Sequence, residues 1–95
     1  MVKLVKYADV KERLLKTPEA RKAYEEMDDE IRAIRLMAEI RRETGMTQAE
    51  LAEKMKTQKS NISRLENGNT DPRLSTLFSY ARALGVEIEF TVKPR

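Results

Sequence analysis

The sequence predicts a mainly α-helical bundle with a helical extension on its N-terminal side and one β-strand after the last helix. Three observations lead to this fold class. Apolar residues recur at steps of three and four from Ala20 to Ala38, which is typical of an amphipathic helix. A helix-start signal at residues 47–50 precedes two short helical stretches. Residues 86–92 alternate apolar and polar side chains with the period of two that is typical of a half-buried strand.

Composition excludes several classes of function. Of the 95 residues, 37% are charged and 5% are aromatic, which fits a small, heavily solvated helical domain. The absence of Cys and His excludes disulfides, thiolate or imidazole metal sites and Ser-His or Cys-His nucleophiles. The carboxylates show no recognisable acid/base spacing, so we expect neither enzymatic activity nor a cofactor. No apolar run approaches the roughly 20 residues that span a bilayer, so we expect a cytoplasmic protein without a membrane partner.

Charge is distributed unevenly along the chain. Residues 1–30 hold seven Lys and Arg against eight Asp and Glu, a net of −1, whereas residues 31–95 hold twelve against eight, a net of +4. Residues 54–64 contain four basic side chains and no acid. A basic patch beside a more acidic segment is typical of a nucleic-acid binder with a second partner. Taken alone, the patch is also consistent with an ordinary solvated helix face.

The first helix-start signal is Thr17-Pro18, because Thr is a good N-cap and Pro is tolerated at the first helical position. The apolar stripe that follows ends at Gly45, a suitable C-cap glycine. Asp28-Asp29 could cap a second helix within this stretch, so one long helix and two shorter ones are both open. Residues 9–15 are a candidate for a further short helix.

The helix that starts near Thr47 is the best specified in the chain. In its capping box, the Thr47 hydroxyl can accept from the Glu50 amide while the Glu50 carboxylate accepts from the Thr47 amide. This helix should run to about Met55 and be followed by a three-residue break and a second helix over residues 59–66. Such a pair forms a helix-turn-helix, whose second helix enters the major groove of DNA. On spacing alone, a helical hairpin of any small bundle is an equal alternative.

The outer face of the second helix has the chemistry of base recognition. Ile62 and Leu65 should face the core, and the side chains left outside are those of Lys59, Ser60, Asn61, Ser63 and Arg64. Arg and Lys can pair with the O6/N7 edge of guanine, and Asn can pair with the N6/N7 edge of adenine. This face is therefore the candidate for reading DNA.

The last two elements follow a turn cluster at residues 67–72. A helix is expected over residues 74–84, with Leu74, Leu77, Ala81 and Leu84 inward and Gly85 as its stop. The strand after it carries Val86, Ile88, Phe90 and Val92 on one side, and its backbone groups need a partner. The simplest partner is the same strand of a second copy, which would make a homodimer; residues 2–7 of the same chain are the alternative.

Several ordered stretches resemble the XRE family of phage-repressor-like helix-turn-helix domains. They are Gly45–Ala52 (GMTQAELA), Ser60–Gly68 (SNISRLENG), Pro72, Thr76-Leu77 and Ala83–Val86 (ALGV), and the resemblance covers about residues 33–86. It implies a repressor-like bundle that binds double-stranded operator DNA. Two positions depart from the pattern. Lys56 stands where the family usually has Gly, and Gln58 stands where a capping Ser or Thr is common, so the recognition helix could start one residue off.

The resemblance and the basic patch together name the expected DNA-binding residues: Gln48, Lys56, Gln58, Lys59, Ser60, Asn61, Arg64, Asn67, Asn69 and Thr70. Gln48 matches the glutamine that in such repressors contacts a phosphate and supports the recognition helix. Asn67, Asn69 and Thr70 match the loop that approaches the DNA backbone. A solvated first-turn side chain is the alternative for Gln48, and a simple C-cap is the alternative for Asn67-Gly68.

The helical extension over Lys16–Met27, together with a terminal strand in place of a fifth helix, looks like the HigA-type antitoxins of bacterial type II toxin–antitoxin pairs. Such proteins repress their own operon and neutralise a RelE-like or HigB-like ribonuclease toxin. Acidic side chains around an apolar face could occupy the basic RNA-binding groove of such a toxin. The candidates are Asp9, Glu12, Leu15, Glu19, Tyr24, Glu25 and Glu26.

The sequence thus divides into an extension (1–30), a helix-turn-helix domain (31–85) and a dimerisation strand (86–95). The main alternative is a stand-alone phage-type repressor without a toxin, in which residues 1–30 only complete the core. A module that binds proteins alone is a further alternative, and its affinity for DNA would not depend on salt.

Overall fold

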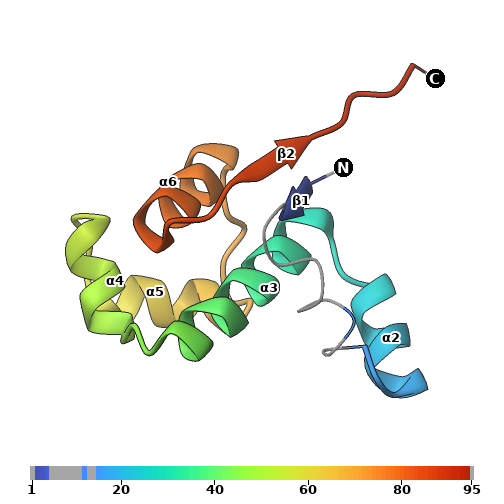
Figure 1. Cartoon of the computed structure of the whole chain (residues 1–95), viewed down its shortest axis with the longest axis horizontal. Coiled ribbons are helices and arrows are strands. Elements are labelled where there is room, and N and C mark those ends of the chain that lie inside the picture. The colour runs from blue at the N-terminus through green and yellow to red at the C-terminus, as the bar shows by residue number, and fades with distance from the viewer. Residues whose placement is uncertain (1, 5–11, 13–14, 95) are drawn as a thin grey trace.

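The computed structural model describes residues 2–4, 12 and 15–94 and confirms the predicted mainly helical bundle. Its helices are α2 (Pro18–Glu25), α3 (Asp29–Thr44), α4 (Gln48–Lys54), α5 (Lys59–Glu66) and α6 (Leu74–Leu84), and its strands are β1 (Val2–Leu4) and β2 (Ile88–Phe90). Helices α3 to α6 gather into one body, whereas α2 lies beyond the N-terminal end of α3 (Figure 1). The candidate helix over residues 9–15 lies outside the described residues, apart from Glu12 and Leu15.

Two helices, rather than one, occupy the stretch before Gly45. Helix α2 begins as predicted, with Pro18 in its first turn and the Ala20 amide donating to Thr17 Oγ1 at 3.1 Å. Helix α3 begins after Asp28, whose extended backbone (φ −65°, ψ 153°) separates the two helices and whose side chain makes no capping hydrogen bond. Gly45 ends α3 with a φ of 79°, the left-handed conformation that favours glycine.

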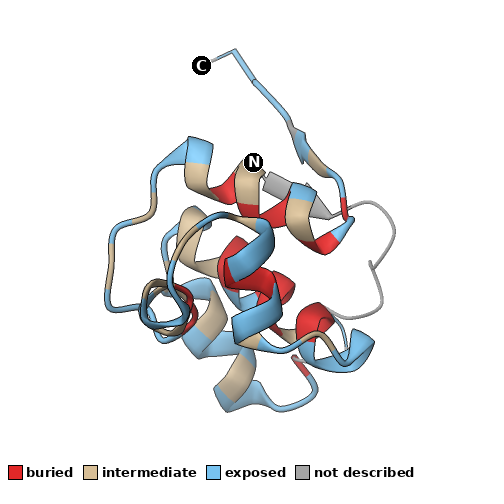
Figure 2. Cartoon of the chain, turned by 90° about the vertical axis from the view of Figure 1, so that its left-hand side faces the viewer, coloured by how far each residue is buried: buried red, intermediate tan, exposed pale blue. Residues whose placement is uncertain are grey.

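The hydrophobic core lies where α3, α4, α5 and α6 meet, and Figure 2 shows the buried residues gathered in the centre of the bundle. Its most deeply buried side chains are Ile34, Met37, Ile40, Leu51, Ile62, Leu77 and Tyr80. The inward prediction for Leu74 is wrong, because Leu74 lies in the first turn of α6 and is 49% exposed. The buried position is taken instead by Tyr80, which follows Leu77 by three residues and so shares its stripe.

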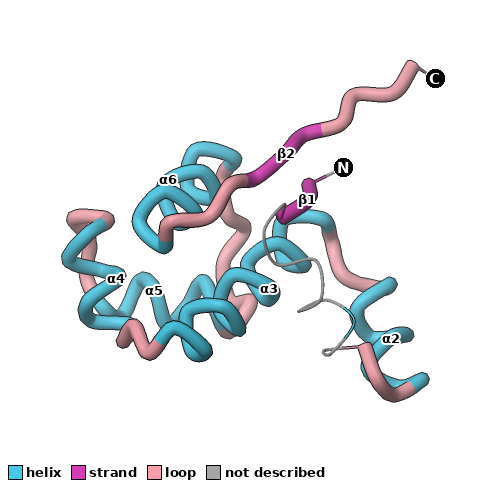
Figure 3. Tube along the Cα trace, in the orientation of Figure 1, coloured by secondary structure: helices cyan, strands magenta, loops and turns pink. Residues whose placement is uncertain are grey.

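Strands β1 and β2 form a two-stranded antiparallel sheet within the chain. Val2 lies opposite Phe90, Lys3 opposite Glu89, and Leu4 opposite Ile88. The intrachain alternative for the strand's partner is therefore observed, and β1 adds a strand to the single one predicted. β2 is also shorter than the alternation over residues 86–92 indicated, and residues 91–94 continue beyond it (Figure 3). In the part of the chain that the structure describes, no helix is long and apolar enough to cross a membrane.

Candidate nucleic-acid interface

Helices α4 and α5 form a helix-turn-helix whose start is fixed by the predicted capping box. The Glu50 amide donates to Thr47 Oγ1 at 3.0 Å, and the Thr47 amide donates to Glu50 Oε1 at 3.1 Å. Because the carboxylate accepts this backbone hydrogen bond, the pKa of Glu50 is lowered. Two of the unpaired amides at the start of α4 are thus satisfied reciprocally.

Lys56 turns the chain between the two helices. Its φ is 55°, so it takes the left-handed conformation in which the family usually places Gly. The Lys56 amide donates to the Glu53 carbonyl at 3.1 Å, and the Thr57 amide donates to the Ala52 carbonyl at 2.9 Å. These bonds close the C-terminal end of α4. The departure from the family pattern therefore leaves the turn intact and leaves the Lys56 side chain exposed.

Helix α5 starts at Lys59, as predicted, although Gln58 makes no side-chain capping bond. The outward face includes Lys59, Ser60 and Arg64, which are exposed, and Asn61, which is half-buried. Asn61 Nδ2 donates to Thr57 Oγ1 at 2.8 Å, and Asn61 Oδ1 accepts from Arg64. These bonds hold the amide and the guanidinium side by side before any ligand is present. A guanidinium has five N–H donors, so Arg64 retains donors for a base edge or a phosphate.

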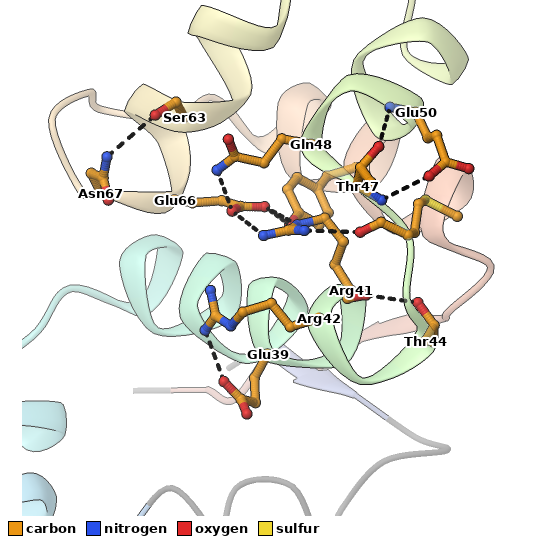
Figure 4. A network of polar contacts seen from close by, with 12 residues as sticks. Glu39, Arg41, Arg42, Thr44, Thr47, Gln48, Glu50, Ser63, Glu66 and Asn67 are labelled. Atoms are coloured by element: carbon orange, nitrogen blue, oxygen red, sulfur yellow. Dashed lines mark hydrogen bonds and ion pairs between the residues drawn. The ribbon is translucent and has the colours of Figure 1, made fainter.

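The inner face of α5 is anchored by a buried carboxylate, that of Glu66. Arg41 donates to both of its oxygens, from Nε at 2.7 Å and from Nη2 at 2.8 Å (Figure 4). Gln48 Nε2 donates to the same carboxylate at 3.0 Å, and the Tyr80 hydroxyl also donates to it. Arg41 Nη1 further donates to the Met46 carbonyl at 2.8 Å. One side chain of α5 is therefore tied to α3, α4 and α6.

Electrostatics keep this anchor ionised. Burial by itself raises the pKa of Glu66, but the hydrogen bonds from Arg41, Gln48 and Tyr80 outweigh burial, so the pKa is lowered overall. Burial, with the neighbouring Glu66 carboxylate, raises the pKa of Tyr80, which therefore stays a protonated donor. The hydrogen bond to Glu66 raises the pKa of Arg41. The anchor is thus a charged pair with two additional donors at neutral pH.

Sequence reasoning anticipated Gln48 as a support for the recognition helix but missed Arg41, Glu66 and Tyr80. The bond from Gln48 to Glu66 supplies that support, while its contact with a phosphate remains a prediction. A signal for the others was present. Arg41 follows Met37 by four residues and Glu66 follows Ile62 by four, so two opposite charges occupy inward positions of two helical stripes.

The loop after α5 begins with a backbone cap. Gly68 has a φ of 74°, and its amide donates to the Leu65 carbonyl at 3.2 Å. The Asn69 amide donates to the Arg64 carbonyl at 3.0 Å. This cap matches the simpler interpretation of Asn67-Gly68, yet Asn67 and Asn69 also stay exposed toward solvent. Asn61, Arg64 and Thr70 line an open depression of about 580 Å³, which also contains Arg73, a basic residue that was not predicted.

The toxin-binding candidates lie at the other end of the molecule, on and before α2 (Figure 1). Glu12, Glu19, Glu25 and Glu26 are exposed, and no residue of α2 is buried. Tyr24 is half-buried, with the Arg32 guanidinium 5.7 Å from its ring centroid.

Two candidates differ from the others. Leu15 is only 7% exposed, so it belongs to the core of the free chain and is not an accessible anchor for a partner. Asp9 lies outside the described residues.

The α4–α5 surface offers hydrogen-bond donors and positive charge. Within the described ranges, no cluster of three acidic side chains is arranged to hold a metal ion. Most exposed groups of α5 and its flanking turns are ammonium, guanidinium, amide and hydroxyl groups, and the turn after α5 adds one exposed carboxylate, that of Asp71. These groups suit phosphates and base edges.

Comparison with known proteins agrees with this geometry. The helix-turn-helix family matches residues 37–90, more than half of the chain. A curated protein of Mycobacterium tuberculosis (strain ATCC 25618 / H37Rv), named "Putative antitoxin HigA2", is 38% identical over 68 residues. The aligned region covers 70% of this chain and 66% of the relative, just under two thirds of its length. No solved structure gives a significant match. The resemblance to XRE-family and HigA-type proteins is confirmed, and the chain belongs to the helix-turn-helix family.

Proposed function

We propose that this chain is a sequence-specific DNA-binding antitoxin that represses its own operon and neutralises a RelE-like ribonuclease. The observation that carries the DNA-binding part is the outer face of α5. Asn61 and Arg64 are held together there by a hydrogen bond, on a helix whose inner face is fixed through Glu66. A helix that reads base edges needs such fixed side chains, because loosely held groups lose entropy when they bind.

Charge supports the same surface. Lys54, Lys56, Lys59 and Arg64 are all exposed, and no acid lies between them in the sequence. Lys56 and Lys59 flank the turn at the start of α5, where they suit phosphates, whereas Arg64 and Asn61 suit base edges. We therefore assign positioning on the duplex to the lysines and sequence specificity to Asn61 and Arg64.

A binding titration tests the DNA part. The full chain is titrated against a duplex from the region upstream of its own gene and against a shuffled duplex of equal length, at one fixed salt concentration. Specific binding should be about 10³-fold or more tighter than binding to the shuffled duplex. Arg64→Ala should lose about 1–3 kcal/mol on the specific duplex and little on the shuffled one. Arg35→Ala is the matched control, because Arg35 is an exposed arginine of α3. If the Arg64→Ala and native chains bound the specific duplex with equal affinity, α5 would not be the DNA-binding helix.

The antitoxin part is supported by the name of the M. tuberculosis relative and by the exposed acids of α2. Ribonucleases attract phosphate with basic surfaces, so exposed carboxylates can occupy such a surface and keep RNA away. The double variant Glu25→Lys/Glu26→Lys should fail to protect cells from the co-expressed basic protein of the neighbouring reading frame, while its DNA affinity stays unchanged. Glu53→Lys is an exposed charge reversal on α4 and should still protect. Full protection by the double variant would place the toxin contact elsewhere.

A stand-alone repressor is the second candidate, and one observation favours it. Leu15 is buried and Tyr24 packs against the core, so part of the extension completes the fold of this chain itself. Under this alternative, co-expression with neighbouring reading frames would give no protection, although specific DNA binding would persist. The protection assay therefore distinguishes the two candidate functions, whereas both predict the same result in the DNA titration.

A further inference from the structure

A chain of side-chain hydrogen bonds runs along the outer face of α5, from the turn before the helix to Arg64. Asn61 Nδ2 donates to Thr57 Oγ1 at 2.8 Å, and Arg64 Nη2 donates to Asn61 Oδ1. Asn61 and Arg64 are three positions apart, a spacing that brings side chains together on a helix surface. Thr57 and Asn61 are half-buried, whereas Arg64 is exposed. The hydrogen bonds therefore lead from partly covered groups to an exposed guanidinium.

The backbone of the helix-turn-helix fixes the start of this chain of bonds. The Thr57 amide donates to the Ala52 carbonyl at 2.9 Å, which ties the backbone at Thr57 to α4. The Asn61 amide donates to the Gln58 carbonyl at 3.0 Å in the first turn of α5. An exposed arginine side chain otherwise has many accessible rotamers, and ordering them on a ligand opposes binding. The bond from Arg64 to Asn61 reduces this cost before DNA is present.

Both polar atoms of the Asn61 side chain already have partners in the free chain. A bidentate contact with adenine uses the oxygen and the nitrogen of an asparagine amide together. Asn61 would have to break or share its bonds with Thr57 and Arg64 to make that contact. Arg64 needs no such exchange, because a guanidinium has five N–H donors and the bond to Asn61 uses one of them. The arrangement suits Arg64 as the group that reads a base and Asn61 as its support.

Other charged side chains near Arg64 do not replace this support. Asp71 lines the same depression as Arg64, but among the described residues it makes no ion pair with Arg64. Arg73 lines the depression too, and it carries the same charge as Arg64. Among the described residues, the hydrogen bond to Asn61 is therefore the contact that sets the direction of the Arg64 side chain.

We propose that Thr57 and Asn61 are positioning residues that direct Arg64 to the O6/N7 edge of one guanine in the specific duplex. Arg64 touches the base, and Thr57 acts on Arg64 through Asn61. The inference rests on the proposed function, because it requires α5 to lie in the major groove. It adds Thr57 to the residues that determine specificity. It also gives Asn61 its effect on specificity through Arg64 and not through a base of its own.

Base preference at single positions tests the proposal with the full chain. The duplex from upstream of the gene is changed one base pair at a time, and discrimination is the ratio of affinities for the original and the changed duplex. Arg64→Ala should lose about 5- to 150-fold of discrimination at one G·C position. Thr57→Val and Asn61→Ala should each lose about 2- to 10-fold at that same position, because each removes one hydrogen bond of the chain. Both variants should bind the shuffled duplex as the native chain does.

Two control variants separate positioning from a general effect on the fold. Thr57→Ser keeps the hydroxyl and should retain the native discrimination. Thr76→Val is the matched control and should also retain it, because Thr76 is a half-buried threonine of α6 that lines the same depression. In a double-mutant cycle, Thr57→Val should cause no further loss of discrimination once Arg64→Ala is present.

Nuclear magnetic relaxation of the Arg64 Nε–H in the free, ¹⁵N-labelled chain gives a second readout that does not use DNA. Thr57→Val should make this group more mobile, whereas Thr57→Ser should leave it as ordered as in the native chain. A loss of global stability alone would not produce this local change while the chain stays folded.

Several results would overturn the proposal and leave the proposed function intact. Asn61→Ala could lose discrimination at an A·T position of its own, which would show that Asn61 reads a base. Native discrimination in Thr57→Val, or an equally ordered Arg64 Nε–H in Thr57→Val and the native chain, would exclude positioning by Thr57. Full discrimination in Arg64→Ala is a different failure, because it would overturn the assignment of α5 in the proposed function together with this inference.

Discussion

The helix-turn-helix unit and α2 are attached to the core in different ways. A capping box, a left-handed turn and four donors around Glu66 hold α4 and α5, whereas α2 has an N-cap bond and no buried residue. The charges of the segments beside them also differ. Residues 54–64 contain four bases and no acid, whereas residues 25–30, from the end of α2 into the start of α3, contain five acids and no base. Helix α2 itself holds two acids and two bases. A surface that reads bases must be fixed before it binds, whereas a helix that covers a basic partner can gain order from that partner. The two ends therefore suit two kinds of partner.

The largest difference in the free energy of unfolding should separate the loss of a carboxylate on α5 from the loss of one on α2. Glu66→Ala leaves the buried Arg41 charge without its partner, so it should lower the free energy of unfolding by about 3–5 kcal/mol. Glu19→Ala removes an exposed carboxylate of α2 and should change it by less than about 0.5 kcal/mol. Urea unfolding followed by circular dichroism measures both. Similar effects of the two substitutions would show that Glu66 does not anchor α5.

Lowering the pH should weaken the stabilisation that the Glu66 carboxylate provides. The pKa of Glu66 is lowered in the folded chain, so its contribution is complete above the usual value of 4.5 and is lost as the pH falls through the lowered value. Tyr80→Phe removes one donor that lowers this pKa and should reduce stability by about 1–3 kcal/mol at pH 7. The same substitution should have a smaller effect at a pH below the lowered pKa of Glu66, where the carboxyl group is protonated. Unfolding curves across this range check the sign, and an effect that grew on acidification would contradict it.

A smaller effect on the free energy of unfolding should appear at Lys56, in the turn between α4 and α5. Lys56→Gly relieves a left-handed φ of 55° and should raise the free energy of unfolding by about 1 kcal/mol. The same change at Lys54, the last residue of α4, should lower it by at most about 1 kcal/mol, because glycine weakens a helix. Lys56→Gly should also reduce the salt dependence of DNA binding by about one unit of the log–log slope. A destabilised Lys56→Gly chain would show that the lysine conformation is not strained.

The smallest difference in the free energy of unfolding should separate the two threonine N-caps, Thr47 and Thr17. Thr47→Ala removes the cap of α4 and should lower the free energy of unfolding by about 1 kcal/mol. Thr17→Ala removes the cap of α2, and its effect should stay below about 0.5 kcal/mol because α2 buries no residue and can fray locally. Parallel urea titrations of the two variants compare them. Equal effects would mean that α2 unfolds together with the bundle.

Local signals explain which parts of this fold the sequence predicts well. The start of α4, both ends of α5 and both ends of α6 follow from the capping box, the turn residues and Gly85, all of which act within a few residues. The bond between Arg41 and Glu66 joins residues 25 positions apart, so only the tertiary arrangement decides it. The same holds for the partner of β2, because the alternation over residues 86–92 describes a strand but not the chain that pairs with it. The spacing of Leu74 predicts an inward side chain, but spacing alone does not show that the first turn of α6 lies at the surface.

The most direct test of the account is a map of the amides that respond to DNA. Spectra of the ¹⁵N-labelled full chain are recorded with a duplex from upstream of its gene and with a shuffled duplex. We expect the largest shift changes at residues 59–64 and 67–70 with the specific duplex, and unchanged amides over residues 18–26 of the α2 region. Changes concentrated on α2, or identical changes with the shuffled duplex, would contradict the assignment of α5 as the helix that reads DNA.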